Sequence, residues 1–256
     1  MAPMNPGSLA GRIALVTGAN DPAGLGHGIA QSLVADGATV YFGCRTAAQV
    51  KRLATEFDAD PARRAIELDV ADPAMIAAAF RRIEAEAGRL DLLVNNAGVG
   101  TNRAALEETA AEWDRIMIVN ARGPFLCAQA AARLMRPRGF GRIVNVSSQA
   151  GSVAIVNHAA YASSKAALNM LTRSAALEWA PFGITVNAVA PTYLLTPGTR
   201  GSLEQPEFLR SVLSRIPAGR VGTIGDVAHV VRFLCQPESS LITGAIVPVD
   251  GGWTLP

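Results

Sequence analysis

Residues 12–26 read RIALVTGANDPAGLG and join a short apolar run to a glycine-rich loop. The run Arg12–Thr17 favours a buried strand of a parallel sheet. Apolar residues then recur at helical spacing until Gly37, which predicts a helix that ends there. A glycine loop between a strand and a helix lets the backbone approach a pyrophosphate at the helix N-terminus. The stretch therefore predicts a dinucleotide site, the alternative being a tight turn without a ligand.

Six further apolar runs follow this unit and alternate with helical patterns. They are Ala38–Phe42, Ala65–Val70, Leu90–Val94, Arg142–Val146, Ile184–Ala190 and Ala245–Val249. Such alternation indicates parallel βαβ units with right-handed connections. We predict an α/β fold with a single Rossmann-like, doubly wound parallel sheet of about seven strands and helices on both faces. The chain is expected to be one dinucleotide-binding and catalytic domain, 1–256, with a lid segment around 192–220, because so long a connection is more often a lid than filler.

The helical patterns differ in how clearly they begin and end. Helices are expected at Val50–Phe57, from Asp72-Pro73 to Ala87, over about Ala104–Met135, at Tyr161–Trp179, around Phe208–Ser214, and from a cap at Asp226 to Cys235. Asp72 and Pro73 suit an N-cap and a first helical position. Asn120 lies in the middle of the longest pattern, where an asparagine competes for backbone hydrogen bonds and indicates a kink or a functional site.

Composition excludes several classes of protein. The chain has 256 residues, half of them hydrophobic, and a net charge of +2 without a basic stripe, which argues against nucleic acid as a partner. No apolar run reaches about 18 residues, so no membrane span is expected. The three histidines are dispersed, so no metal site is expected. Three separated cysteines, Cys44, Cys127 and Cys235, and a start without a signal-peptide pattern predict reduced thiols and a cytoplasmic protein.

One short stretch carries chemistry. Tyr161 and Lys165 are four residues apart and would share one face of a helix. An ammonium beside a phenol favours the phenolate, which would lower the tyrosine pKa from about 10 toward neutrality. The chain has only two lysines and three tyrosines, so this spacing arises by chance roughly 2% of the time. Ser148, thirteen residues before Tyr161, would hold the substrate oxygen while Tyr161 exchanges its proton. The alternative is a helix with Lys165 on its wet edge.

The residues after the second expected strand bear on the cofactor. A fold that selects NAD places Asp or Glu about 20 residues past the glycines, on the ribose 2′-hydroxyl. Here that place holds Cys44 followed by Arg45. A missing carboxylate and an adjacent arginine favour the 2′-phosphate of NADP(H), the alternative being a solvated Arg45 at a helix start. Asp69 and Asn96 fall at strand ends, where ligands gather, although each alone is more often a turn-former.

With these residues in place, the chain resembles the short-chain dehydrogenase/reductase family over about Leu9–Thr254. It is similar to the main branch with a Tyr-x-x-x-Lys site, which includes 3-oxoacyl reductases and polyol dehydrogenases. The matching pieces occur in the family's order: Thr17-Gly18, Asp69-Val70, Asn95–Gly98, Asn120, Ser148, Tyr161 with Lys165, Pro191–Thr196 and Val249–Gly252.

The resemblance implies a role for each catalytic candidate. Tyr161 would be the general acid/base, and Lys165 would lower its pKa and hold the nicotinamide ribose. Ser148 would orient the carbonyl or alcohol, and Asn120 would anchor a water in the proton relay. Together with the glycine loop and Arg45, the cofactor-binding residues are then Gly18, Asn20, Gly24, Leu25, Gly26, Arg45, Asp69, Val70, Asn96, Ala97, Gly98, Tyr161, Lys165, Pro191, Leu194 and Thr196.

Two departures from the family pattern stand out. Five residues separate Gly18 from Gly24, where the family usually has three. That length is similar to the enoyl-acyl carrier protein reductase branch, but that branch spaces its tyrosine and lysine more widely, so alkene reduction is not expected here. The longer loop leaves the contacts of Asn20 and Asp21 open. The usual Pro-Gly after the sixth strand is Pro191-Thr192, which is expected to alter the lid hinge and the substrate pocket.

The function that follows is reversible hydride transfer between NADP(H), or NAD(H), and a ketone or secondary alcohol, as in a carbonyl reductase or ketoreductase. An alternative is an NAD-dependent polyol or sugar dehydrogenase, because Asn157–Tyr161 is similar to such relatives. An alternative from another class is a non-catalytic dinucleotide-binding sensor, which has no need of the complete catalytic set. The expected partners are a small carbonyl or alcohol substrate and further copies of the chain, as a homotetramer or else a dimer; the physiological substrate is not identified.

Overall fold

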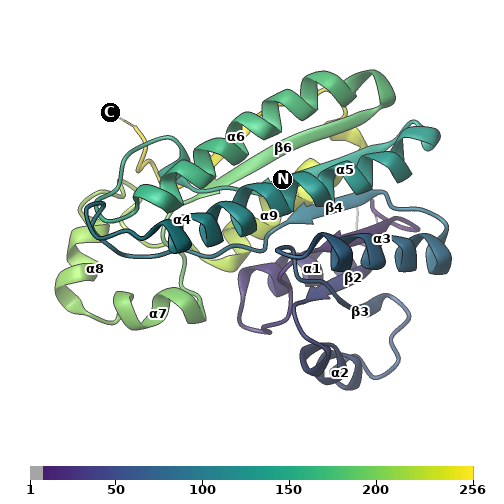
Figure 1. Cartoon of the computed structure of the whole chain (residues 1–256), viewed down its shortest axis with the longest axis horizontal. Coiled ribbons are helices and arrows are strands. Elements are labelled where there is room, and N and C mark those ends of the chain that lie inside the picture. Colours follow the sequence, from purple (N-terminus) through teal and green to yellow (C-terminus); the bar gives the residue numbers. More distant parts are fainter. Residues whose placement is uncertain (1–7, 256) are drawn as a thin grey trace.

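A computed structural model describes residues 8–255, so most of the expectation about the chain start lies outside the described residues. The strands found there are β1 (Ile13–Val16), β2 (Thr39–Cys44), β3 (Arg63–Glu67), β4 (Leu92–Asn95), β5 (Gly141–Val146), β6 (Ile184–Pro191) and β7 (Ile246–Val249). They form one seven-stranded sheet in the order β3-β2-β1-β4-β5-β6-β7, and every neighbouring pair is parallel (Figure 1). The predicted doubly wound parallel sheet is confirmed.

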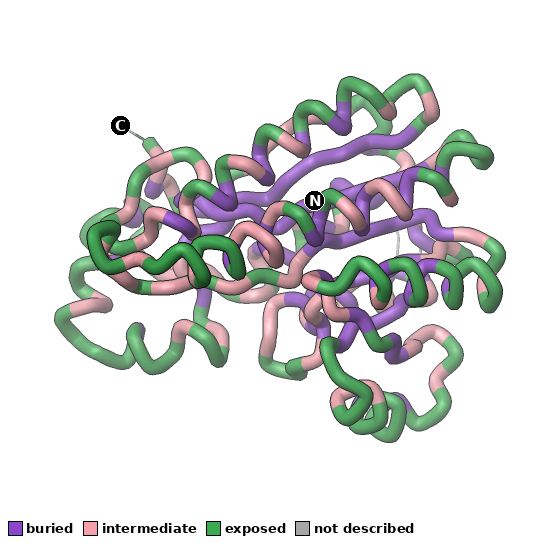
Figure 2. The backbone as a smooth tube through the Cα atoms, viewed as in Figure 1, coloured by how far each residue is buried: buried purple, intermediate pink, exposed green. Residues whose placement is uncertain are grey.

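Helices cover both faces of this sheet. They are α1 (Leu25–Ala35), α2 (Ala47–Glu56), α3 (Pro73–Ala87), α4 (Ala110–Met117), α5 (Gly123–Met135), α6 (Ala159–Trp179), α7 (Pro197–Leu203), α8 (Pro206–Leu213) and α9 (Ile224–Cys235). Successive strand residues point to opposite faces. Accordingly, Val16 packs in a buried cluster with residues of α1, α2 and α9, whereas Leu15 packs with residues of α3, α5 and α6. Figure 2 shows the result, with buried strands between helices whose outer faces are exposed.

Two helix starts test the capping predictions. Asp72 accepts hydrogen bonds from the backbone N–H groups of Ala74 and Met75 ahead of Pro73, so that prediction is confirmed. The prediction for α9 is wrong by one turn, because Thr223 is the N-cap. Asp226 lies inside the first turn, where its carboxylate completes a capping box with Thr223.

The predicted long helix over Ala104–Met135 is interrupted and begins later than expected. Thr109 caps α4 through its side chain, so the helix begins at Ala110. A π-helical turn, Ile118–Arg122, separates α4 from α5. Asn120 lies within that turn and is fully buried. The prediction that this asparagine marks a kink or a functional site therefore corresponds to a real irregularity of the helix.

The segment 192–220 contains two short helices and has a small core of its own. The helix expected around Phe208–Ser214 is present as α8, whereas α7 was not predicted. Leu203, Val212, Ile216 and Trp253 form a buried cluster separate from the two clusters on the sheet faces.

Across the described residues, no helix is long and apolar enough to cross a membrane. The three cysteines are buried and unpaired.

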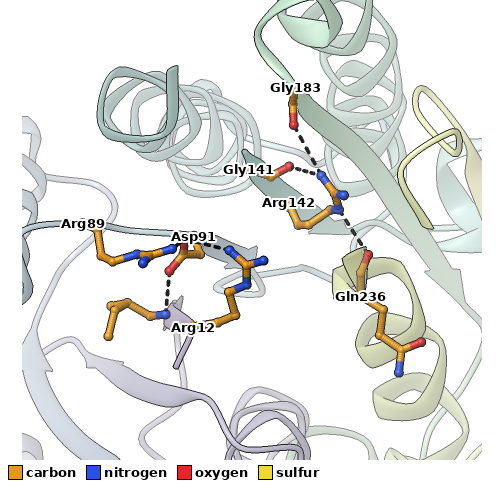
Figure 3. A network of polar contacts seen from close by, with 8 residues as sticks. Arg12, Arg89, Asp91, Gly141, Arg142, Gly183 and Gln236 are labelled. Carbon is orange, nitrogen blue, oxygen red and sulfur yellow. Dashed lines mark hydrogen bonds and ion pairs between the residues drawn. The ribbon is translucent and has the colours of Figure 1, made fainter. Parts of the chain in front are cut away.

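The amino edge of the sheet buries a carboxylate among arginines. Asp91, just before β4, is 0% exposed. Its Oδ2 atom accepts a hydrogen bond of 2.9 Å from the backbone N–H of Ile13. Its Oδ1 atom lies 3.5 Å from Arg12 Nη1 and also pairs with Arg89 (Figure 3). The Arg12 guanidinium carbon lies 3.8 Å from the ring centroid of Phe140. The buried negative charge is thus met by two cations and an N–H group.

A buried arginine stands beside this group. Arg142 in β5 is 3% exposed and donates to the main-chain carbonyls of Gly141, Gly183 and Gln236 at 2.9–3.4 Å (Figure 3). It also donates to the carbonyl of Pro237 at 3.2 Å. Gln236 ends α9, so the guanidinium meets the negative end of that helix. Burial lowers the pKa of Arg142 from its ordinary value. Four carbonyl groups compensate for the water that the cation has lost.

Candidate active site

The carboxyl edge of the sheet opens onto two adjoining cavities. The tyrosine cavity, of about 590 Å³, contains Ser148, Tyr161 and Lys165 in its wall. The glycine-loop cavity, of about 610 Å³, is lined by the loop after β1 and the ends of β2 to β4. Leu25, Asn96, Gly98 and Val99 line both. Together the cavities form a continuous cleft at the place where open parallel sheets bind ligands.

The cleft gathers every residue that the sequence analysis assigned to cofactor binding. The glycine-loop cavity is lined by Gly18, Asn20, Leu25, Gly26, Arg45, Asp69, Val70, Asn96, Ala97 and Gly98. The tyrosine cavity is lined by Gly24, Tyr161, Lys165, Pro191, Leu194 and Thr196, among others. Residues from distant parts of the chain meet here because all of them follow strands of the same parallel sheet.

The glycine loop is held in place by the end of β4. Thr17 Oγ1 accepts hydrogen bonds of 3.0 Å from the backbone N–H groups of Asn96 and Ala97. Asn96 Nδ2 donates to the carbonyls of Thr17 and Gly18. Gly18 has φ +65°, and a Cβ atom there would lie 3.0 Å from Ala97 Cα. A Cβ atom at Gly26 would clash with Asn96 Nδ2. Positions 18 and 26 therefore have no room for a side chain, which lets the backbone at the start of α1 approach a pyrophosphate closely.

The insertion in the loop forms a turn before α1. Asp21 O accepts a hydrogen bond of 2.8 Å from Gly24 N–H, and Asp21 Oδ1 accepts one of 3.0 Å from Ala23 N–H. The Arg52 guanidinium donates to the carbonyl of Asn20. The two extra residues are thus accommodated in a compact turn, and Gly24 still serves as the N-cap of α1.

The end of β2 presents a cation and no carboxylate. The Cys44 thiol is buried, and burial raises its pKa to about 11, so it is uncharged near neutrality. Arg45 is exposed and lines the glycine-loop cavity, as does Arg115 of α4. Among the described residues, no carboxylate forms an ion pair with Arg45. The Arg45 guanidinium is therefore available to a phosphate.

Tyr161 and Lys165 share one face of α6 as predicted. The Lys165 ammonium nitrogen lies 5.7 Å from the centroid of the Tyr161 ring. It donates a hydrogen bond of 2.8 Å to the carbonyl of Val146, at the end of β5. Lys165 is 4% exposed, so its charge lies almost entirely inside the protein.

The expected electrostatic effect on the tyrosine is wrong for this arrangement. Burial raises the pKa of Tyr161, and a hydrogen bond with Ser148 opposes that rise only in part. Burial also lowers the pKa of Lys165 to about 8. Loss of water is the largest cause of both shifts, and the lysine donates its hydrogen bond to Val146. Tyr161 therefore keeps its proton near neutral pH and is suited to donate it.

Ser148 follows β5 and caps a short 3₁₀ turn, Gln149–Gly151. Its Oγ atom accepts a hydrogen bond of 3.1 Å from Ala150 N–H and donates one of 3.0 Å to Gln149 Oε1. The hydroxyl lines the tyrosine cavity beside the phenol. Its role of holding a substrate oxygen stays a prediction.

Asn120 lies behind the cavity wall. Its Oδ1 atom accepts a hydrogen bond of 2.9 Å from Val99 N–H. Its Nδ2 atom donates to Val99 O at 2.8 Å and to Ser164 Oγ at 3.0 Å. These bonds join the loop after β4 to α6, and Asn120 lines neither of the two cavities described above. Its side-chain amide thus acts on the protein itself, and a role in anchoring water stays a prediction.

The cleft also contains polar residues that the sequence analysis did not assign a role. Gln149, His158, Thr101, Asn102 and Tyr193 line the tyrosine cavity. The His158 ring lies 6.1 Å from the Tyr161 ring, and its Nδ1 atom is 2.7 Å from the carbonyl of Val156. Their position in the sequence was the signal that could have identified two of them, since Gln149 directly follows Ser148 and His158 lies three residues before Tyr161. Within residues 8–255, no group of three or more potential metal ligands occurs.

Comparisons with known proteins agree with this geometry. A family model described as enoyl-(acyl carrier protein) reductase matches residues 18–254. The chain is 41% identical over 251 residues to galactitol 2-dehydrogenase (L-tagatose-forming) of Cereibacter sphaeroides, covering 96% of each protein. It is 40% identical over 246 residues to L-xylulose reductase of Bos taurus, covering 96% of this chain and 97% of the relative.

Solved structures are similar along almost the whole chain. One is a gluconate 5-dehydrogenase from Burkholderia cenocepacia J2315 in complex with NADP and tartrate. It superposes with a TM-score of 0.92 at 35% sequence identity and covers 97% of both chains.

Proposed function

The chain belongs to the short-chain dehydrogenase/reductase family, and on that basis we propose that it is an NADP(H)-dependent oxidoreductase that acts on a ketone or secondary alcohol. The observation that carries the proposal is the convergence of Ser148, Tyr161 and Lys165 on one cavity, which adjoins the glycine-loop cavity. A dinucleotide site without catalysis has no need of that second cavity and its proton-transfer groups.

The chain's own residues supply the proton and the orientation. Bound NADP(H) gives or takes the hydride. Ser148 Oγ holds the substrate oxygen, and Tyr161, which keeps its proton because burial raises its pKa, donates that proton to the oxygen as the carbonyl is reduced. The buried Lys165 ammonium contributes positive charge beside the phenol. In the reverse direction the phenolate form of Tyr161 accepts the proton from the alcohol, so oxidation first requires Tyr161 to lose its proton.

The residues present fit a phosphorylated dinucleotide. The glycine loop is free of side chains where Gly18 and Gly26 approach β4, and α1 begins directly after it. We assign the 2′-phosphate to Arg45, because that guanidinium has no carboxylate partner among the described residues and Cys44 replaces the usual acid. The solved relative named above also contains NADP.

The cofactor assignment is tested by reversing the charge. Arg45→Asp is expected to lower the ratio of kcat/KM with NADPH to kcat/KM with NADH by about 10- to 100-fold, the worth of one charge-assisted hydrogen bond. Arg138→Asp serves as the control, because this exposed arginine lies in the 3₁₀ turn before β5 and lines neither cavity. An unchanged ratio in Arg45→Asp would favour NAD(H) and the NAD-dependent alternative.

We further propose that the substrate is a polyhydroxylated ketone or its alcohol. The relatives named above act on galactitol, L-xylulose and gluconate according to their names. The tyrosine cavity presents Gln149, His158 and Asn102, whose amide and imidazole groups suit hydroxyl groups better than an acyl chain.

A panel of substrates tests the reaction itself. Ketoses, polyols, sugar acids and 3-oxoacyl thioesters are each mixed with NADPH or NADP⁺, and the nicotinamide absorbance is followed. Turnover is expected with at least one polyhydroxylated ketone. Preference for a 3-oxoacyl thioester would overturn the substrate class alone. Cofactor binding without turnover on any member would instead support the dinucleotide-binding sensor.

Three further expectations become proposals with structural support. We propose that 192–220 is a lid, because the start of α7 lines the tyrosine cavity and residues of α7 and α8 belong to an apolar cluster separate from the sheet core. We propose a homotetramer, because apolar side chains are exposed on α4, α5 and α6, namely Trp113, Phe125, Met170 and Leu177. A monomer by light scattering at high concentration would refute it.

We propose a cytoplasmic location, because the three buried cysteines are unpaired.

A further inference from the structure

Asn169 continues the row of functional side chains on α6. Tyr161, Lys165 and Asn169 follow one another at intervals of four residues and so lie along one face of the helix. Asn169 is 6% exposed and does not line the tyrosine cavity. It faces the protein interior at the point where the chain leaves β5.

The side-chain amide of Asn169 joins α6 to both sides of Ser148. Its Oδ1 atom accepts a hydrogen bond of 2.6 Å from Ser147 Oγ, which also lies 3.5 Å from Lys165 O. Its Nδ2 atom donates a hydrogen bond of 3.2 Å to Gly151 O. Ser147 comes directly before Ser148, and Gly151 ends the turn that Ser148 caps.

The same turn is packed directly against the helix backbone. A Cβ atom at Gly151 would lie 2.8 Å from Asn169 Nδ2 and 2.9 Å from the carbonyl carbon of Lys165. Ser148 itself makes its closest side-chain bonds within the turn, to Gln149 and Ala150. Close packing at Gly151 and the two hydrogen bonds of Asn169 thus hold the turn against α6, in addition to the hydrogen bond from Lys165 to Val146 O just before the turn.

We propose that Asn169 is a positioning residue that fixes the distance of Ser148 from Tyr161 and Lys165 by tying the two sides of the serine turn to the helix that carries the other two groups. The inference rests on the proposed function. Its expected size follows from the geometry of catalysis, since a displacement of about 1 Å at a reacting group costs up to about 100-fold in rate.

Asn187 provides a matched comparison. It is also a buried asparagine, 1% exposed, and its amide also makes two hydrogen bonds to the chain. Its Nδ2 atom donates to Ile242 O at 2.7 Å, and its Oδ1 atom accepts from Ala245 N–H at 3.1 Å. These bonds join β6 to the segment before β7, and Asn187 lines neither cavity of the cleft. A purely structural amide bridge is therefore available within the same protein.

The test compares Asn169→Leu with Asn187→Leu in the full-length enzyme. Thermal unfolding, the Kd for NADPH and steady-state kinetics are measured on both. Both variants are expected to lose stability, because each buries an unpaired carbonyl or hydroxyl. Only Asn169→Leu is expected to lower kcat, by about 10- to 100-fold, with the Kd for NADPH within about twofold of wild type. An equal loss of kcat in the two variants would overturn the proposal.

Ser147 gives a second route if Asn169→Leu does not fold. Ser147→Ala removes one of the two bonds and is expected to lower kcat several-fold, whereas Ser147→Thr keeps a hydroxyl and is expected to restore most of it. Ser147→Ala with wild-type kcat would contradict the positioning role. The same experiment distinguishes failure of this inference from failure of the proposed function. A wild-type enzyme without turnover on the substrate panel would contradict both. An active wild-type enzyme whose variants keep the wild-type kcat would contradict only the positioning role.

Discussion

Buried charged groups at the two edges of the sheet differ in how many partners they have. At the amino edge, Asp91 meets two arginines and a backbone N–H group, and Arg142 meets four carbonyls. At the carboxyl edge, Lys165 is equally buried but has one hydrogen bond, to Val146 O, and no ion pair with any described carboxylate. At the amino edge each buried charge has several partners, whereas at the carboxyl edge the Lys165 ammonium has only one hydrogen bond among the described residues.

The number of partners of a buried charge indicates whether the group serves stability or the reaction. A buried ion that is fully paired has no capacity left for a ligand, and removal of one of its partners is costly because it leaves an uncompensated charge. A buried ammonium with one partner has a lowered pKa and remaining donors, which is the condition found at functional sites. We therefore expect changes at the amino edge to alter stability without altering the reaction, whereas changes at the carboxyl edge should alter the reaction.

The largest effect is expected for Tyr161→Phe at the carboxyl edge. Loss of the proton donor should lower kcat by about 10²–10⁴-fold, with the Kd for NADPH and the melting temperature little changed. Tyr41→Phe is the control, because the Tyr41 hydroxyl is bonded to Glu86 at 2.9 Å outside the cleft. Steady-state kinetics, cofactor titration and thermal unfolding give the comparison. Near-normal turnover in Tyr161→Phe would remove the basis of the proposed reaction.

The next effect is expected at the amino edge. Asp91→Ala leaves Arg12 and Arg89 without their shared carboxylate and should lower the free energy of unfolding by about 3 kcal/mol. The kcat of the folded enzyme should be unchanged. Glu56→Ala, which breaks an exposed pair with Arg52, should cost no more than about 0.5 kcal/mol. Urea unfolding measures both, and a loss of kcat in Asp91→Ala would show that the two edges are coupled.

The smallest effect concerns the pH dependence of stability. Burial lowers the pKa of Lys165 to about 8 in the folded protein, whereas an unfolded lysine titrates near 10.5. Between these values the unfolded chain holds a proton that the folded chain has released, so stability rises with pH. Relative to Lys165→Met, the wild type should gain about 2 kcal/mol between pH 8 and pH 10. Urea unfolding at several pH values tests this, and parallel curves for the two proteins would argue against a lowered pKa for Lys165.

Much of the fold could be predicted from local pattern. Most strands are short apolar runs, and β1 to β6 are each followed by a helix, so the order of elements implied the parallel sheet before any contact was known. The candidate site followed for the same reason, because residues at the ends of parallel strands converge on one edge. The four-residue spacing of Tyr161 and Lys165 then placed both on one side of α6.

The rest depends on contacts between distant residues. Asp91 and Arg12 are 79 positions apart, and neither residue type signals the pairing. The raised pKa of Tyr161 arises from how much protein surrounds it, which spacing alone does not reveal. Asn169 was not assigned a role because its partners, Ser147 and Gly151, are 22 and 18 positions away. The helix α7 was missed because Gly198 and Gly201 weaken its pattern, while Pro197 and the cap at Thr196 support it.

The π-helical turn at Ile118–Arg122 has a consequence for how this chain tolerates length changes. Such a turn holds one residue more than an α-helical turn, which corresponds to a rotation of about 100°. The turn therefore lets α4 and α5 each direct a buried side inward, at Ile116 in α4 and at Cys127 and Met135 in α5. Asn120 is buried between them. Deleting a single residue here would turn one of these faces outward. We expect insertions and deletions among descendants of this gene to spare the turn and to accumulate in the loops on either side.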